Sequence, residues 1–144
     1  MFRTGVLRSF NARHALRGEF GTETLPHTHP YQVEWICESP VLDRNGFSVD
    51  ISRMEKTMES VLQAIDGRLL NDLDYFRNRQ PSLENLAVYL HLELERAFSL
   101  SGAFRDQIGT TEVRIWESAT AWASYSSRTV DQTTEVTESE DPPT

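Results

Sequence analysis

Two alternating stretches near the N-terminus carry three of the four histidines of this 144-residue chain. The first stretch ends at His14, and the second opens with His27 and His29. Side chains two residues apart in a strand point to the same face, so His27 and His29 project together, about 6.6 Å apart along the strand. If the strand ending at His14 pairs beside them, three imidazoles converge. Three imidazoles are what a catalytic zinc takes, with a fourth position left open, although the same spacing also occurs on an ordinary polar strand face.

Size and composition favour one soluble globular domain. The chain is 25% charged and 38% hydrophobic, and it contains no apolar run near the ~18 residues that a membrane helix needs. We therefore expect no membrane partner, and the absence of a signal-peptide core near Met1 favours a cytoplasmic location. The net charge of −8 and the lack of a basic stripe argue against nucleic acid as a partner. One cysteine, Cys37, excludes an internal disulfide framework.

The charge pattern predicts where the domain ends. Five acids and no base follow Arg128, and the segment ends in Pro-Pro-Thr. We expect residues 1–128 to form the folded domain and residues 129–144 to be an acidic, disordered tail.

Periodicity predicts two long strands first. Residues 5–17 and 28–39 alternate, and the loop between them contains Gly18, Gly21 and Pro26. A turn is expected at residues 43–46, followed by a brief alternation through Phe47, Val49 and Ile51.

Two helices and two further strands follow. Ser52 and Glu55 read as a capping box at the start of a helix whose apolar stripe runs to Ile65, with Gly67 as the C-terminal cap. Ser82 reads as the N-cap of a second helix that ends before Gly102. His91 lies beside the apolar stripe of this helix, and we expect it to be structural or solvent-facing. Residues 111–117 and 121–126 read as short strands.

The order β-β-α-α-β-β predicts an α+β fold, with a four-stranded antiparallel sheet and both helices on one face. Such a sheet has two open edges. Because long unpaired edges invite pairing with another chain, we expect a ring of subunits.

Six short pieces of sequence occur in a particular order along the chain. They are Phe10 to His14, His27-Thr28-His29, Asp43 with Gly46 and Asp50, Leu70-Asn71-Asp72, Pro81-Ser82 with Glu84-Asn85, and Arg114 to Ser118. With these pieces, the chain resembles the 6-pyruvoyl- and 6-carboxy-tetrahydropterin synthase family from about Phe10 to Tyr125. The resemblance implies the tunnelling fold (T-fold), in which trimers close a twelve-stranded barrel and two trimers often stack. It also implies one Zn²⁺ per subunit, active sites at subunit boundaries, and 7,8-dihydroneopterin triphosphate or a close relative as substrate.

The resemblance assigns roles to individual residues. The three histidines would hold zinc, and Glu117 would accept N–H bonds from the pterin ring. The family's usual base is a cysteine, and Glu23 stands at its position here. Asp66 matches the aspartate of a proton-relay pair, but Gly67 replaces the histidine that normally follows it. Cys37 lies too far along the strand, roughly 26 Å from His29, to serve as the base.

These residues leave several functions open. The first hypothesis is a zinc-dependent lyase that forms the pyruvoyl or carboxy product or, as Glu23 favours, cleaves the side chain to 6-hydroxymethyl-7,8-dihydropterin. The second is a non-catalytic zinc-containing binder of pterins or purine analogues, which the loss of the relay histidine favours. The third is a structural zinc site, which normally takes four protein ligands.

Overall fold

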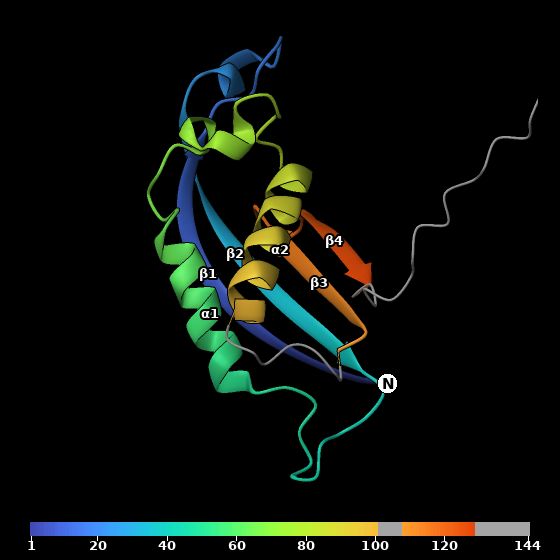
Figure 1. Cartoon of the computed structure of the whole chain (residues 1–144). Coiled ribbons are helices and arrows are strands. Elements are labelled where there is room, and N and C mark those ends of the chain that lie inside the picture. Colours follow the sequence, from blue (N-terminus) through green and yellow to red (C-terminus); the bar gives the residue numbers. More distant parts are fainter. Residues whose placement is uncertain (101–107, 129–144) are drawn as a thin grey trace, which may run out of the picture.

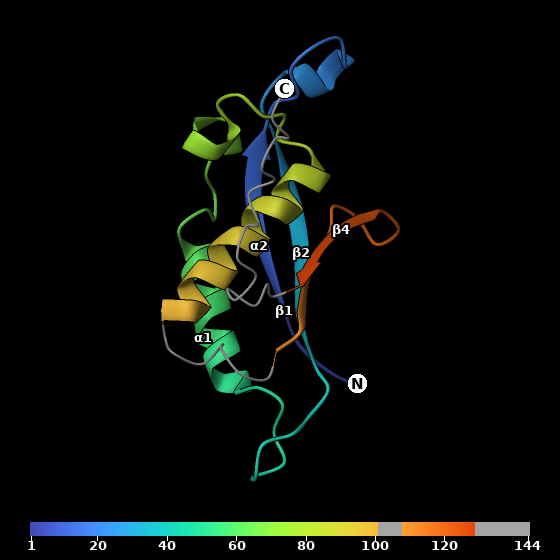
Figure 2. The ribbon, with the colours of Figure 1, turned by 45° about the vertical axis from the view of Figure 1, so that its right-hand side comes forward.

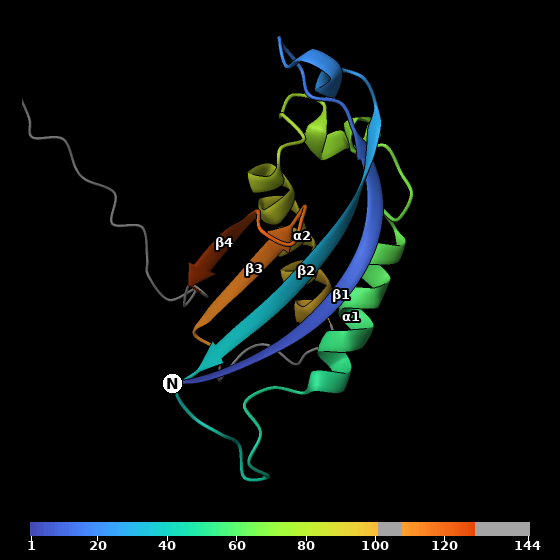
Figure 3. The same cartoon turned by 180° about the vertical axis from the view of Figure 1, so that it is seen from behind.

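The computed structural model describes residues 1–100 and 108–128. Four strands form one antiparallel sheet in the order β1-β2-β3-β4, and both α-helices cover one face of it (Figure 1). Seen from behind, the other face of the sheet carries no helix formed by the described residues (Figure 3). The elements in chain order are β1 (Phe2–His14), the 3-10 turn η1 (Gly21–Thr24), β2 (His27–Ser39), α1 (Ile51–Gln63), the 3-10 turns η2 (Leu70–Asp72) and η3 (Asp74–Phe76), α2 (Leu83–Leu100), β3 (Thr110–Trp116) and β4 (Trp122–Arg128). The predicted α+β architecture is confirmed.

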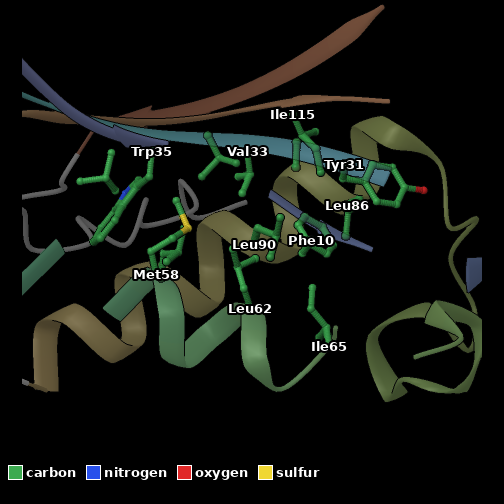
Figure 4. Close-up of a cluster of buried hydrophobic side chains, with 14 of the residues drawn as sticks. Phe10, Tyr31, Val33, Trp35, Met58, Leu62, Ile65, Leu86, Leu90 and Ile115 are labelled. Atoms are coloured by element: carbon green, nitrogen blue, oxygen red, sulfur yellow. The ribbon is translucent and has the colours of Figure 1, made fainter. Parts of the chain in front are cut away.

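The alternation seen in the sequence determines which face each strand buries. In β1 and β2 the apolar residues of one parity are buried, as with Phe10 opposite Tyr31 and Val6 opposite Trp35. Helix α2 buries a stripe that includes Leu90 against this face, and the side chains of α1 complete the core (Figure 4). The helices therefore cover the sheet face that also carries the histidines.

Helix α1 begins earlier than the capping-box prediction places it. The N-cap is Asp50, whose carboxylate accepts a hydrogen bond from the Arg53 N–H at 3.2 Å. Ile51 already lies in the helix, so the predicted alternation through residue 51 does not form a strand. An aspartate is as good an N-cap as a serine, and the capping-box pattern at Ser52 was therefore misleading by two residues.

The predicted cap at Gly67 is also wrong in position. Helix α1 ends at Gln63 with Ala64 as its C-cap. Gly67 lies three residues later with φ of +72°, and its N–H donates to the Asn11 carbonyl at 2.7 Å. Gly67 is thus a turn residue that joins the end of α1 to β1, a role for which its left-handed conformation is needed.

Other boundaries shift by a few residues. Strand β1 ends at His14 rather than residue 17, and β4 extends to Arg128. Ser82 is confirmed as the N-cap of α2, because its hydroxyl accepts the Asn85 N–H at 3.2 Å. The predicted stop at Gly102 and the predicted tail 129–144 lie outside the described residues. Within residues 1–100 and 108–128, neither α-helix has the length and apolarity to cross a bilayer.

Candidate active site

The register of β1 and β2 brings the three histidines together. His14 and His27 form the last pair of the ladder, and Ala12 lies opposite His29. All three imidazoles therefore project from the same face at the same end of the sheet. Their ring centroids are 4.5, 4.9 and 4.8 Å apart, and one nitrogen of each lies within 4.8 Å of the others.

Backbone carbonyls determine which ring nitrogens are free. His14 Nδ1 lies 2.7 Å from the Pro81 carbonyl, and His27 Nδ1 lies 2.8 Å from the Leu25 carbonyl. A carbonyl can only accept, so both Nδ1 atoms carry a proton, and in the neutral tautomers that this selects both Nε2 atoms present lone pairs. This is the outer-shell arrangement that orients metal-binding histidines.

The two free nitrogens make a cation the best-fitting occupant. His14 Nε2 and His27 Nε2 are 2.8 Å apart, a distance at which two lone pairs repel unless a positive charge lies between them. Two nitrogens in a tetrahedral shell at about 2.0 Å from zinc lie roughly 3.3 Å apart, which is about 0.5 Å wider than this spacing. Among the described residues no fourth His, Cys, Asp or Glu joins the cluster, so one coordination position would stay open.

Burial favours the neutral form of His14. Desolvation is the main cause that lowers its pKa, and the neighbouring His27 and His29 lower it further, while the hydrogen bond to Pro81 and the charge of Glu117 raise it. A neutral imidazole is the form that binds a metal.

Glu117 and Tyr31 lie at the same end of the sheet. Gln32 pairs with Trp116, so Glu117 follows directly at the level of Tyr31. Burial is the main cause that raises the pKa of Tyr31, and the charge of Glu117 raises it further. The same charge opposes the burial that lowers the pKa of His14. The Tyr31 ring lies 5.7 Å from that of His29. Tyr31 is missing from the sequence-based set of site residues, although its position two residues after His29 could have indicated it.

The two remaining predicted residues lie elsewhere around β1. Glu23 is exposed in η1, and its backbone carbonyl accepts the Leu16 N–H at 2.8 Å. Asp66 accepts the Asn11 N–H at 2.9 Å on the edge of β1 that faces away from β2. The structure therefore places Glu117 at the same end of the sheet as the histidines, leaves Glu23 in the turn η1, and places Asp66 on the far side of β1.

Cys37 is not part of this site. It is a free, buried thiol near the other end of β2, and burial raises its pKa to about 12. Such a thiol is a poor base at neutral pH.

The comparisons with known proteins identify the family. A family model described as 6-pyruvoyl tetrahydropterin synthase matches residues 5–128. The chain belongs to this family. Its members are lyases of pterin metabolism, and the family uses a metal.

Curated relatives agree with this membership. The 6-pyruvoyl tetrahydrobiopterin synthase of Drosophila melanogaster is 35% identical over 66 residues, which cover 44% of this chain and 39% of the relative. A putative enzyme of the same name from Caenorhabditis elegans is 27% identical over 117 residues, covering 69% and 84%. The dihydroneopterin monophosphate aldolase of Pyrococcus furiosus is 28% identical over 82 residues, covering 57% and 65%.

Solved structures share the fold. The 6-pyruvoyl tetrahydropterin synthase of C. elegans superposes with a TM-score of 0.73 at 24% identity, covering 86% of this chain and 94% of that one. The Plasmodium falciparum enzyme has the same TM-score at 18% identity, with coverages of 89% and 98%. A Plasmodium vivax enzyme in which a catalytic glutamate is replaced by alanine has a TM-score of 0.71 at 16% identity, with coverages of 90% and 100%. The subunit architecture of the tunnelling fold, a four-stranded antiparallel sheet with two helices on one face, is thereby confirmed.

Proposed function

We propose that the protein is a zinc-dependent lyase that acts on 7,8-dihydroneopterin triphosphate and cleaves its side chain to 6-hydroxymethyl-7,8-dihydropterin. The observation that carries this proposal is the three-histidine cluster with an open coordination position, at the end of the sheet where Glu117 follows β3. A structural zinc is disfavoured, because such sites are normally closed by four protein ligands. Zinc bound by the histidines would act as a Lewis acid toward oxygens of the substrate side chain.

Glu117 and Glu23 would divide the remaining work. Glu117 would accept two N–H bonds from the pyrimidine edge of the pterin, a charge-assisted contact that orients the ring as well as binding it. Glu23 would take the proton from a side-chain hydroxyl of the substrate. The carbon–carbon bond next to that hydroxyl would then break, leaving an aldehyde. The electron pair of the broken bond would stay on the carbon attached to the ring, and this carbon would take up a proton to give 6-hydroxymethyl-7,8-dihydropterin.

Cleavage is favoured over the pyruvoyl and carboxy products by two findings. Glu23 supplies a carboxylate where the family's usual cysteine would stand, and a related P. vivax enzyme has a catalytic glutamate. One relative, from P. furiosus, is an aldolase of a dihydroneopterin phosphate. The role of Asp66 as a relay within the same chain's site gains no support, because its carboxylate faces the opposite edge of β1.

A second candidate is a non-catalytic pterin binder that keeps the metal. Gly67 favours it, since this position offers no side chain for proton transfer next to Asp66. In that case Glu117 and the metal would hold the ligand and no product would form.

Product analysis separates these candidates. The purified zinc-loaded protein is incubated with 7,8-dihydroneopterin triphosphate, and in parallel with the monophosphate, and products are resolved by chromatography. We expect 6-hydroxymethyl-7,8-dihydropterin from the wild type and a loss of at least 100-fold in kcat for Glu23→Ala, in line with general-base catalysis. Glu19→Ala, an exposed acid in the same loop, is the matched control. Unchanged turnover in Glu23→Ala excludes Glu23 as the base, and tight binding without product supports the binder.

We also propose a homo-oligomer, a trimer or a dimer of trimers, because β1 and β4 are the outer strands and no described strand pairs with the outer side of β4 or of residues 2–10. The cytoplasmic location expected from the sequence stays a prediction.

A further inference from the structure

Beyond His14 the chain loses its partner strand but not its hydrogen bonds. His14 and His27 form the last pair between β1 and β2, so residues 15–17 extend past the end of the ladder. Strand ends fray unless something satisfies their backbone groups. A metal ligand on the last pair therefore needs support from outside the sheet.

Two side-chain amides provide that support by acting as a partner strand. Asn71 accepts the Ala15 N–H and donates to the Ala15 carbonyl, both at 2.9 Å. Gln80 accepts the Arg17 N–H at 2.8 Å and donates to the Arg17 carbonyl at 3.0 Å. Both residues come from the segment between α1 and α2, which lies beside the end of β1 in Figures 1 and 2.

Arg17 adds a third connection to the same segment. Its guanidinium donates to the carbonyls of Phe76 and Arg79. The Gln80 carbonyl in turn accepts the Asn85 side-chain N–H at 2.9 Å in the first turn of α2. We call Arg17, Asn71 and Gln80 the amide clasp. It anchors residues 15–17 to the start of α2.

The clasp reaches the site on two sides. On one side, the connection between α1 and α2, to which residues 15–17 are bonded, also supplies the Pro81 carbonyl, which lies 2.7 Å from His14 Nδ1. On the other side, Leu16 lies between the two clamped residues, and its N–H holds the Glu23 carbonyl. One set of contacts therefore positions both a metal-binding imidazole and the turn that carries the proposed base.

We propose that Arg17, Asn71 and Gln80 are positioning residues of the three-histidine site. They fix the Nδ1–H tautomer and the orientation of His14 through Pro81, and they fix η1 through Leu16. The part that concerns Glu23 rests on the proposed function, whereas the part that concerns His14 does not.

The test uses Gln80→Met, which keeps side-chain length and removes both hydrogen bonds, and Gln80→Ala as a second variant. Gln63→Ala, an exposed glutamine on α1, is the matched control. In the metal-free protein, long-range ¹⁵N NMR of the imidazoles reports the His14 tautomer, and hydrogen exchange reports the Leu16 amide. Co²⁺ titration, followed by absorbance with a competing chelator, gives metal affinity.

We expect both Gln80 variants to mix the His14 tautomers, to speed Leu16 exchange, and to weaken Co²⁺ binding about 10-fold, the usual effect of losing an outer-shell contact. The control should change Co²⁺ affinity less than 2-fold. If the Gln80 variants keep a pure Nδ1–H tautomer and wild-type Co²⁺ affinity, the proposal is overturned, even if the wild type is an active lyase. If the His14 tautomer and the Co²⁺ affinity change in the Gln80 variants but the wild type forms no pterin product, the positioning role of the clasp is supported and the proposed function is refuted.

Discussion

Glu117 tests at a single residue whether the site binds a pterin edge. Glu117→Gln replaces an acceptor-only carboxylate with an amide that turns a donor toward the ring's N–H groups. Losing charge-assisted hydrogen bonds of about 1.5–3 kcal/mol should raise KM for the pterin about 10- to 100-fold, with zinc content unchanged. Steady-state kinetics measure KM, and metal analysis measures the zinc content. Glu112→Gln is the control, since Glu112 lies on β3, the strand that Glu117 follows, but its side chain projects from the opposite face, where it pairs with Arg3 and Arg114. An unchanged KM in Glu117→Gln would contradict the assignment.

His91 shows a second residue-scale effect, away from the site. It is 1% exposed, its Nε2–H donates to the Thr111 hydroxyl at 2.7 Å, and that hydroxyl donates to Glu95 at 2.9 Å. The expectation of a structural or solvent-facing role thus resolves to a structural one. Its Nδ1 is buried without a hydrogen-bond partner among the described residues, and the Tyr125 ring packs edge-on at 5.0 Å.

This arrangement predicts the pH dependence of stability. Burial lowers the pKa of His91 below the usual 6.5, although the Glu95 charge and the Thr111 contact oppose it. Below pH 6.5 His91 therefore binds a proton in the unfolded chain but stays neutral in the folded chain until the pH reaches its lowered pKa. The free energy of unfolding falls as the pH drops through this range. In His91→Gln this loss should be shallower. Urea unfolding of metal-free protein at pH 7, 6 and 5 gives the free energies, and parallel slopes for the two proteins would rule out His91 as a cause.

At the scale of elements, the start of α1 offers a direct comparison of two residues. The structure makes Asp50 the N-cap, whereas the sequence pattern favours Ser52. Asp50→Ala should lower the free energy of unfolding by about 1 kcal/mol, because it leaves a helix N–H unpaired. Ser52→Ala should change it by less than about 0.5 kcal/mol, as expected at an exposed helix position. Denaturant unfolding measures both, and an equal loss in the two variants would favour the capping box instead.

The elements also show what sequence reasoning can and cannot predict. Alternation and register are local properties, so the pairing of His14 with His27 and the face that they share follow from the sequence. The contacts of Asn71 and Gln80 join residues 56 and 63 positions apart, and nothing in local periodicity indicates them. For the same reason the position of Asp66 behind β1 was not predictable from spacing. The course of the connection between α1 and α2 along β1 determines both the amide contacts and the position of Asp66.

On the scale of the whole molecule, β1 is an open edge over only part of its length. Residues 11–17 have their outward backbone groups bonded to the segment between α1 and α2, through Asp66, Gly67, Arg68 and the clasp. Residues 2–10 have no strand on that side among the described residues. This free stretch is about as long as β4, the seven-residue strand at the other edge of the sheet. A second copy could therefore add its β4 to β1 and stop where the clasped segment begins.

This geometry predicts which surface substitution breaks the assembly. Leu7 is 48% exposed in the free part of β1, and a lysine on an edge strand opposes pairing with another chain. Leu7→Lys should shift the protein from a trimer or larger species to a monomer in sedimentation velocity. Leu92→Lys is the matched control, because Leu92 is also 48% exposed but lies on helix α2 rather than on an edge strand. Assembly lost equally in both variants would mean that general surface charge, rather than the edge of β1, controls it. A wild type that sediments as a monomer would refute edge-to-edge assembly altogether.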